Sequence, residues 1–148
     1  MHLSDEVIIP VPRQKVWEAL NDPEILRQAI PGCEEITKHS DTEMEAKVTV
    51  KMGPVKASFK GAVTLSDLDP PNGYRISGSG KSMMGGATGG ANVRLEEVPE
   101  GTKLIYDVDA QVTGKIASLA QRFIEPTARQ LSAQFFESFA KLAAGEQA

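Results

Sequence analysis

The feature that most restricts the fold of this chain is a long amphipathic segment near its C-terminal end, residues 114–144. Its apolar side chains recur at steps of three and four residues, so they lie on one face of an α-helix. They are Ile116, Ala120, Phe123, Ile124, Leu131, Phe135, Phe139 and Leu142. Such a helix is about 45 Å long and needs a broad apolar surface on which to lie. We expect a kink at Pro126, because proline removes a backbone hydrogen-bond donor.

The middle of the chain supplies that surface. Apolar and polar residues alternate there in stretches separated by turn signals, such as those at 53–54 and 69–73. The alternating stretches are 44–52, 55–65, 74–80, 87–95 and 104–112. This alternation predicts strands with one buried face, and the short connections predict an antiparallel meander. Residues 2–9 predict a further strand, and residues 13–21 and 22–30 predict two short helices.

This order of elements predicts the fold class. One strand, two short helices, a meander and a long helix indicate an α+β protein in which a curved antiparallel sheet wraps around the C-terminal helix. No repeat, low-complexity tract or linker divides residues 1–148, so we expect one domain.

Composition and charge exclude several classes of protein. The net charge is −4, and sixteen Lys and Arg residues are scattered among twenty acids, which argues against nucleic-acid binding. No apolar run approaches the roughly eighteen residues of a spanning helix, and the N-terminus lacks a signal-peptide pattern. The single cysteine, Cys33, excludes an internal disulfide and has no obvious histidine base. We therefore expect a cytoplasmic protein.

Many inward positions of the predicted strands hold small residues. They are Ala46, Ala57, Gly61, Gly78, Gly80, Ala87, Gly89, Ala91 and Ala110. Two interpretations remain open. Small residues beneath a long helix leave a hollow, whereas glycines that permit strong sheet curvature let the helix descend and fill the gap.

The wall of such a hollow is predicted from the inward apolar positions. The glycine-rich stretch 82–90 is either a plain hairpin or a mobile loop that gates an apolar entrance. The candidate ligand-binding residues are Trp17, Leu20, Ile30, Met44, Phe59, Gly61, Met83, Met84, Tyr106, Phe123, Thr127 and Leu131. Of these, Tyr106 and Thr127 can donate a hydrogen bond without bringing a charge. Phe136, on the predicted polar arc of the helix, is either an exposed aromatic residue or a contact for a partner or for lipid headgroups.

The sequence contains no convincing motif for catalysis or metal binding. GSGKS at 78–82 lacks the earlier glycine and the following helix of a phosphate-binding loop. His2 and His39 are far apart, and neither has acidic or cysteine partners in a metal-binding motif. Asp107 and Asp109 share the outward face of a predicted strand and are interpreted as solvated charges. We expect no catalytic residue and no metal.

Several segments together resemble a known family along nearly the whole chain. They are IPGCEEI at 30–36, KMGPVKASFKGAVTLSDLDPP at 51–71, the GSGK and GGATGGA stretch at 78–91, TKLIYDVDAQVTGKIASLAQRFIE at 102–125 and QFF at 134–136. These segments resemble the family of the carbon monoxide dehydrogenase G subunit. The order of elements is similar to the helix-grip fold of the START-like (SRPBCC) superfamily, to which that family belongs.

This resemblance implies an accessory, non-catalytic protein of a molybdenum hydroxylase of the carbon monoxide dehydrogenase type. Such a protein binds a quinone or another lipid-like molecule in the helix-grip cavity, has no covalently bound cofactor, and links the enzyme to the inner face of the cell membrane. Some members have a C-terminal extension for membrane attachment, and the ending LAAGEQA departs from that pattern. The alternatives are a ligand-free assembly or adaptor protein, or a small helix-grip enzyme, because proteins of this fold include cyclases and hydrolases.

Overall fold

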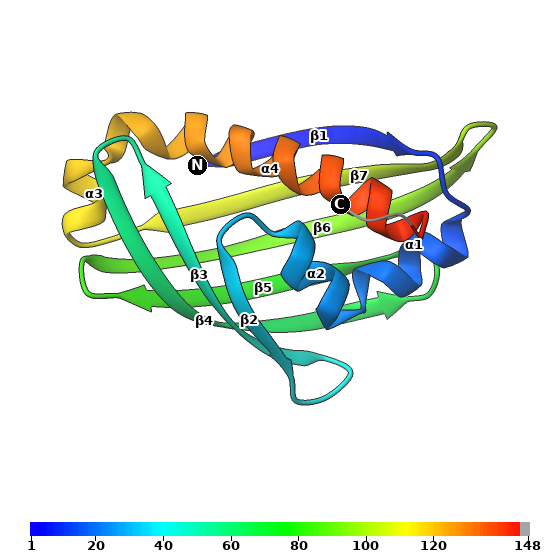
Figure 1. The fold of residues 1–148 in the computed structure, drawn as a ribbon, viewed down its shortest axis with the longest axis horizontal. Helices are drawn as coiled ribbons and strands as arrows, with labels where there is room; N and C mark the ends of the chain where they lie inside the picture. The colour runs from blue at the N-terminus through cyan, green and yellow to red at the C-terminus, as the bar shows by residue number, and fades with distance from the viewer. Residues whose placement is uncertain (146–148) are drawn as a thin grey trace.

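The computed structural model describes residues 1–145, and within them one seven-stranded antiparallel sheet curves around a long helix (Figure 1). The strands are β1 (His2–Ile9), β2 (Cys33–Lys38), β3 (Glu43–Met52), β4 (Val55–Asp69), β5 (Gly73–Ser82), β6 (Gly85–Val98) and β7 (Gly101–Val112). The helices are α1 (Arg13–Leu20), α2 (Pro23–Ala29), α3 (Lys115–Leu119) and α4 (Gln121–Ala143). The predicted α+β helix-grip fold is therefore confirmed.

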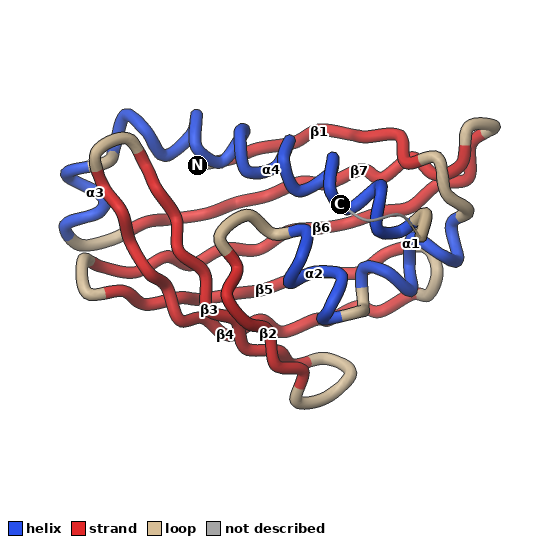
Figure 2. The backbone as a smooth tube through the Cα atoms, viewed as in Figure 1, coloured by secondary structure: helices blue, strands red, loops and turns tan. Residues whose placement is uncertain are grey.

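The strands form a meander whose turns lie at alternate ends of the sheet. The strand order is β1-β7-β6-β5-β4-β3-β2, so β2 to β7 follow one another and β1 pairs with β7. Figure 2 shows the β3–β4 and β5–β6 turns at one end, together with α3. The β2–β3, β4–β5 and β6–β7 turns lie toward the other end. Helix α2 packs against both α4 and β2, which covers part of the inner face.

Two stretches differ from the expectation. The short edge strand β2 was not among the predicted stretches, because Ile36 is its only large apolar side chain. Residues 82–90 are not a loop: β5 continues to Ser82, and β6 begins at Gly85. Glycine keeps its backbone N–H and C=O groups, so the two glycine-rich strands still form a continuous ladder. The expected gating loop is therefore wrong, since only Met83 and Met84 lie between these two strands.

The C-terminal helix is interrupted at Ala120 rather than continuous over 114–144. Ala120 has φ −114° and ψ 9°, and it is completely buried. Helix α3 is held against the β5–β6 turn by a 3.0 Å hydrogen bond in which Ile116 N–H donates to the Met84 carbonyl. This tertiary contact lies close to the interruption at Ala120. Pro126, where we expected a kink, lies inside α4.

Helix α4 is anchored to the sheet near both of its ends. Toward the C-terminal end, Phe139 is completely buried in a cluster that includes Ile9 and Leu104. Toward the N-terminal end, Phe123 packs against a second cluster that includes Ile116. The turns of α4 between these anchors therefore span the curved sheet. No helix within residues 1–145 combines the length and the apolar character needed to cross a lipid bilayer.

Two inward glycines are required by the close approach of neighbouring strands. A Cβ atom on Gly61 would lie 2.9 Å from the Ser79 carbonyl oxygen, and one on Gly89 would lie 2.9 Å from the Asp109 carbonyl oxygen. Real Cβ atoms essentially never come so close to backbone, so these positions favour glycine. At Gly61 and Gly89, the close approach of the neighbouring strand therefore accounts for the glycine.

We expect Gly61→Ala to lower the free energy of unfolding by about 1–3 kcal/mol, because the added methyl group overpacks the Ser79 carbonyl. Gly78→Ala is the matched control in the neighbouring strand, since its Cβ atom would lie 3.5 Å from its nearest neighbour. That variant should be neutral or slightly stabilising. Urea denaturation measures both changes. Equal destabilisation by the two substitutions would contradict a special close approach at Gly61.

Candidate functional site

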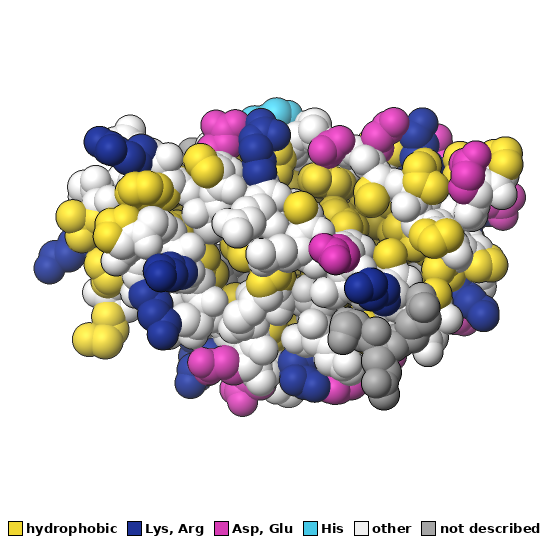
Figure 3. Space-filling view, turned by 45° about the horizontal axis from the view of Figure 1, so that its top comes forward, with side chains coloured by type: hydrophobic (Ala, Val, Ile, Leu, Met, Phe, Trp, Pro, Cys, Tyr) yellow, Lys and Arg dark blue, Asp and Glu magenta, His cyan; other side chains and the backbone are white. Residues whose placement is uncertain are grey.

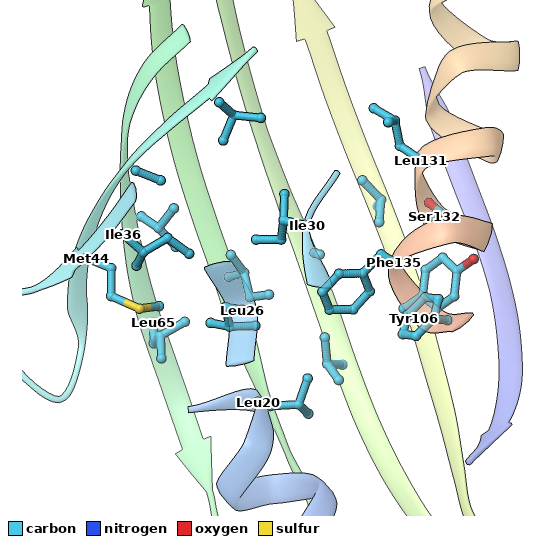
Figure 4. Close-up of a pocket in the computed structure, with 18 of the residues that line it drawn as sticks. Leu20, Leu26, Ile30, Ile36, Met44, Leu65, Tyr106, Leu131, Ser132 and Phe135 are labelled. Carbon is cyan, nitrogen blue, oxygen red and sulfur yellow. The ribbon is translucent and has the colours of Figure 1, made fainter. Parts of the chain in front are cut away.

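An apolar cavity of about 410 Å³ lies between the inner face of the sheet and helices α2 and α4 (Figure 4). It is lined by Leu20, Leu26, Ile30, Pro31, Ile36, Met44, Ala46, Val48, Val63, Leu65, Tyr74, Ile76, Ala91, Val93, Leu104, Tyr106, Val108, Leu131, Ser132, Phe135 and Phe136. No charged side chain of residues 1–145 is among them. The volume is within the range of small-molecule sites. The hollow expected beneath the helix is therefore present.

The periodicity of the strands and helices determines which side chains line the cavity. Alternate residues of a strand share a face, and this brings Ala46 and Val48 of β3 to the cavity with Met44. On α4, residues 131, 132, 135 and 136 line it, which corresponds to one broad helical face. Helix α2 contributes Leu26, and the chain just after it contributes Ile30. The cavity therefore lies where α4 spans the sheet between its two anchors.

Aromatic side chains of α4 form one wall of the cavity. Phe136 stacks on Tyr106 with ring centroids 5.1 Å apart, and Phe135 meets Phe136 edge to face at 5.0 Å. Phe135 also stacks on Phe139 at 5.4 Å. Neither expectation for Phe136 was correct, since it faces the interior. The curved sheet surrounds α4 on more than one side, so a wider arc of the helix is buried than a flat sheet would cover.

Hydroxyl groups are the polar side-chain groups on this wall, and they belong to Tyr74, Tyr106 and Ser132. Burial raises the pKa of Tyr106, and the nearby Asp5 carboxylate raises it further, whereas Ser132 and Arg129 lower it. Figure 4 shows the Tyr106 hydroxyl beside α4 and directed toward β1, away from the centre of the cavity. Tyr106 therefore contributes mainly its ring to the lining.

Tyr74 is the buried polar residue that sequence reasoning missed. Its side chain is 7% exposed, and its ring meets Trp17 edge to face at 5.4 Å. Burial raises the pKa of Tyr74, and within the described chain neither a hydrogen bond nor a nearby charge contributes to this shift. Tyr74 also lines the cavity, so its hydroxyl is a candidate donor to a ligand acceptor. The sequence placed Tyr74 on an inward face but could not reveal that its side chain is buried against Trp17.

The structure brings some of the predicted ligand-binding residues together and separates others. Leu20, Ile30, Met44, Tyr106 and Leu131 line the cavity. Whether any of them binds a ligand stays a prediction.

Seven predicted residues do not line the cavity, and the structure places them elsewhere in five ways. Trp17 packs beside Tyr74, and Gly61 lies against the neighbouring strand. The second core cluster contains Phe59, Met84 and Phe123. Met83 projects fully into solvent. Thr127 lines a separate groove between β3 and α4, together with Phe123 and Gly53. Gly61→Leu is therefore unsuitable for filling the cavity, because its side chain would meet backbone.

The strand register brings together a surface cluster at the β1–β7 edge that sequence spacing did not indicate. His2 Nε2 lies 2.9 Å from Asp107 Oδ1, and Nδ1 lies 2.8 Å from Asp109 Oδ1. Ser4 Oγ lies 3.1 Å from Nε2, which resembles a serine–histidine–aspartate set. However, a hydrogen bond to Asp109 and the charge of Asp107 raise the pKa of His2, which disfavours the neutral base. Ser4 donates to Asp107 at 2.6 Å instead.

The remaining candidate reactive groups, the Cys33 thiol and the possible metal ligands, also lack surroundings that would activate them. Burial raises the pKa of the Cys33 thiol and so disfavours the nucleophilic thiolate. Within residues 1–145, no three His, Cys, Asp or Glu side chains converge as a metal site. The apolar cavity is therefore the strongest candidate for a functional site.

Solved structures with similar folds extend over nearly the whole chain. A conserved protein from Geobacillus kaustophilus is 26% identical with a TM-score of 0.86, and the match covers 97% of this chain and 94% of that chain. Ara h 8.0201 is 17% identical with a TM-score of 0.69 and 99% coverage of both chains. Zhui aromatase/cyclase from Streptomyces sp. R1128 is 16% identical with a TM-score of 0.66, and covers 97% of this chain and 93% of its own. The last two show similarity of fold alone.

A comparison with curated proteins gave no significant match. The family model for the G subunit of carbon monoxide dehydrogenase (CoxG) matches residues 6–144, which include the sheet after its first residues, the cavity and α4. The chain therefore belongs to the CoxG family of carbon monoxide dehydrogenase proteins.

Proposed function

We propose that this protein is a non-catalytic accessory protein of a molybdenum hydroxylase of the carbon monoxide dehydrogenase type. In this role it holds a quinone or another lipid-like molecule in the cavity and links the enzyme to the membrane. Family membership supports the partner. The observation that most directly supports the ligand is the 410 Å³ cavity whose wall has no charged side chain within the described residues.

The chemistry of the wall favours a largely apolar ligand. Removing apolar surface from water contributes roughly 25 cal/mol per Å², so about 200 Å² of buried ligand surface contributes roughly 5 kcal/mol. Association entropy opposes this gain, which gives moderate affinity and exchangeable binding. Such affinity suits a carrier that must also release its ligand.

The Tyr74 hydroxyl is the donor we assign to a ligand carbonyl. The Tyr74 side chain is 7% exposed and lines the cavity. A quinone has two carbonyl acceptors on an apolar ring, so one of them can satisfy this hydroxyl. Tyr106 is less suitable because its hydroxyl is directed toward β1 (Figure 4). Thr127, the other donor predicted from the sequence, lines the separate groove.

An enzymatic role is the less favoured alternative. Zhui aromatase/cyclase has a similar fold, but fold alone does not determine activity. Acid–base catalysis needs a group that changes protonation near working pH. Burial raises the pKa of Tyr74 and of Tyr106, which moves both phenols away from that range. A ligand-free adaptor remains the second alternative, and it predicts that nothing enters the cavity.

Filling the cavity tests ligand binding. We expect Ala91→Leu to weaken a short-chain quinone at least tenfold, because the new side chain occupies the space beside Ile76 and Val108. Ala62→Leu is the matched control, since the same side chain is then added on the exposed outer face of β4. Calorimetry and Trp17 fluorescence measure binding. A folded, ligand-free protein that binds no quinone at tens of micromolar would instead support the adaptor.

Tyr74→Phe tests the assigned donor. Loss of one hydrogen bond of about 1 kcal/mol should weaken the quinone about fivefold. A hydrocarbon analogue without the carbonyl groups should bind equally to both proteins. The free protein should keep its stability, because the phenylalanine ring retains the packing against Trp17. Tyr106→Phe is the control and should change quinone affinity less than twofold; equal losses in both variants would contradict the role of Tyr74.

A further inference from the structure

Exposed basic residues gather at the end of the molecule where the β3–β4 turn, the β5–β6 turn and α3 lie. They are Lys51, Lys56, Lys60, Lys81, Lys115 and Arg122. None of the ion pairs found in residues 1–145 includes any of the six. We refer to these six residues, together with Met83 and Leu119, as the basic end.

Acidic residues are segregated from the basic end. The stretches 46–66, 70–95 and 110–124, which contain its turns and helix α3, have no Asp or Glu. Acids such as Asp69 and Glu100 lie at the turns of the opposite end. Figure 3 shows dark-blue basic and yellow hydrophobic side chains together at the left. Basic residues that are scattered in the sequence are therefore gathered in three dimensions, because the meander brings alternate turns to the same end.

The strand register places like charges opposite one another within the basic end. Lys51 pairs with Lys56, and Lys60 pairs with Lys81. Like charges directly opposite in a sheet are destabilising. All four residues are exposed, so an external anionic surface can offset their repulsion. Sheet stability does not account for this arrangement.

Large apolar side chains project from the same end. Met83, in the β5–β6 turn, is fully exposed, and Leu119, at the end of α3, is 56% exposed. The hydrogen bond between Ile116 and Met84 holds α3 beside this turn. Exposed apolar side chains surrounded by cations are typical of proteins that bind at the boundary between lipid headgroups and acyl chains. There the apolar side chains enter the apolar layer while lysine ammonium groups stay at the phosphates.

We propose that the basic end docks on the surface of an anionic lipid bilayer, an inference that rests on the proposed function and assigns the surface for membrane contact. Unpaired cations give a salt-dependent attraction to anionic lipids. An acidic protein would satisfy the same cations. Exposed Met83 and Leu119 favour the bilayer, because large apolar side chains among the cations can enter its apolar layer.

A groove leads from the basic end toward the cavity. It lies between β3 and α4, and Lys51 and Phe123 are among its lining residues at that end. Pro31 and Leu131 line both the groove and the cavity. Docking through the basic end therefore places this route next to a bilayer, which is the source of a lipid-like ligand.

Vesicle co-sedimentation of the full chain tests this docking. The vesicles contain phosphatidylcholine alone or equal parts of phosphatidylcholine and phosphatidylglycerol, and they contain no quinone. We expect binding to the anionic vesicles only, and less binding at higher ionic strength. The double variant Lys60→Gln and Lys81→Gln should weaken partitioning about 25-fold, at about fivefold per lysine. The double variant Met83→Ser and Leu119→Ser should weaken it about tenfold.

The double variant Lys15→Gln and Lys141→Gln is the matched control, because it removes two exposed lysines outside the basic end. It should change partitioning less than twofold. Equal losses in the control and the basic-end variants, or no binding to anionic vesicles at low ionic strength, overturn the proposal. If the protein does not bind the vesicles but the basic-end variants lose capture of the hydroxylase, the basic end is a protein interface, and this result also overturns the proposal. Quinone titration without vesicles is independent of these outcomes, so failure here is distinguishable from failure of the proposed function.

Discussion

The anchoring of α4 at two separate places is the constraint on which the rest of the structure depends. Phe139 is completely buried at one anchor, and Phe123 packs in the second cluster at the other. A rigid helix held at both ends cannot follow a strongly curved sheet between them. Side chains must then either fill the intervening space or leave it open. Here Leu131 and Phe135 share the wall with small residues such as Ala46 and Ala91, and a cavity remains.

The polarity of that cavity restricts what it can do. A hollow lined by apolar side chains excludes ions and rewards burial of apolar ligand surface. The few hydroxyl groups on its wall then determine how a ligand is oriented. Tyr74 differs from Tyr106 because burial alone shifts its pKa, whereas polar neighbours also contribute to the shift of Tyr106. The same fold accommodates an aromatase/cyclase elsewhere, so differences of this kind within the cavity, rather than the fold, distinguish a carrier from an enzyme.

The electrostatic organisation follows from the same topology. In an antiparallel meander, alternate turns lie at the same end of the sheet, so charges that are distant in sequence become neighbours. Lys60 and Lys81 are paired by register although twenty residues separate them. The groove beside β3 connects this end with the cavity wall at Leu131. The proposed ligand site and the proposed docking surface are thus connected by the arrangement of one sheet and one helix.

The sequence by itself determined the fold class, because hydrophobic periodicities of two and of about 3.6 are local properties that identify the strands and the amphipathic helix. It also identified Leu20, Ile30, Met44, Tyr106 and Leu131, which line the cavity, since inward positions follow from the same periodicity. Only the tertiary structure decided the interruption at Ala120, the inward direction of Phe136 and the burial of Tyr74 against Trp17. These depend on how far apart strands and helix lie and on which side chains meet across them, and such distances are set by packing between segments remote in sequence.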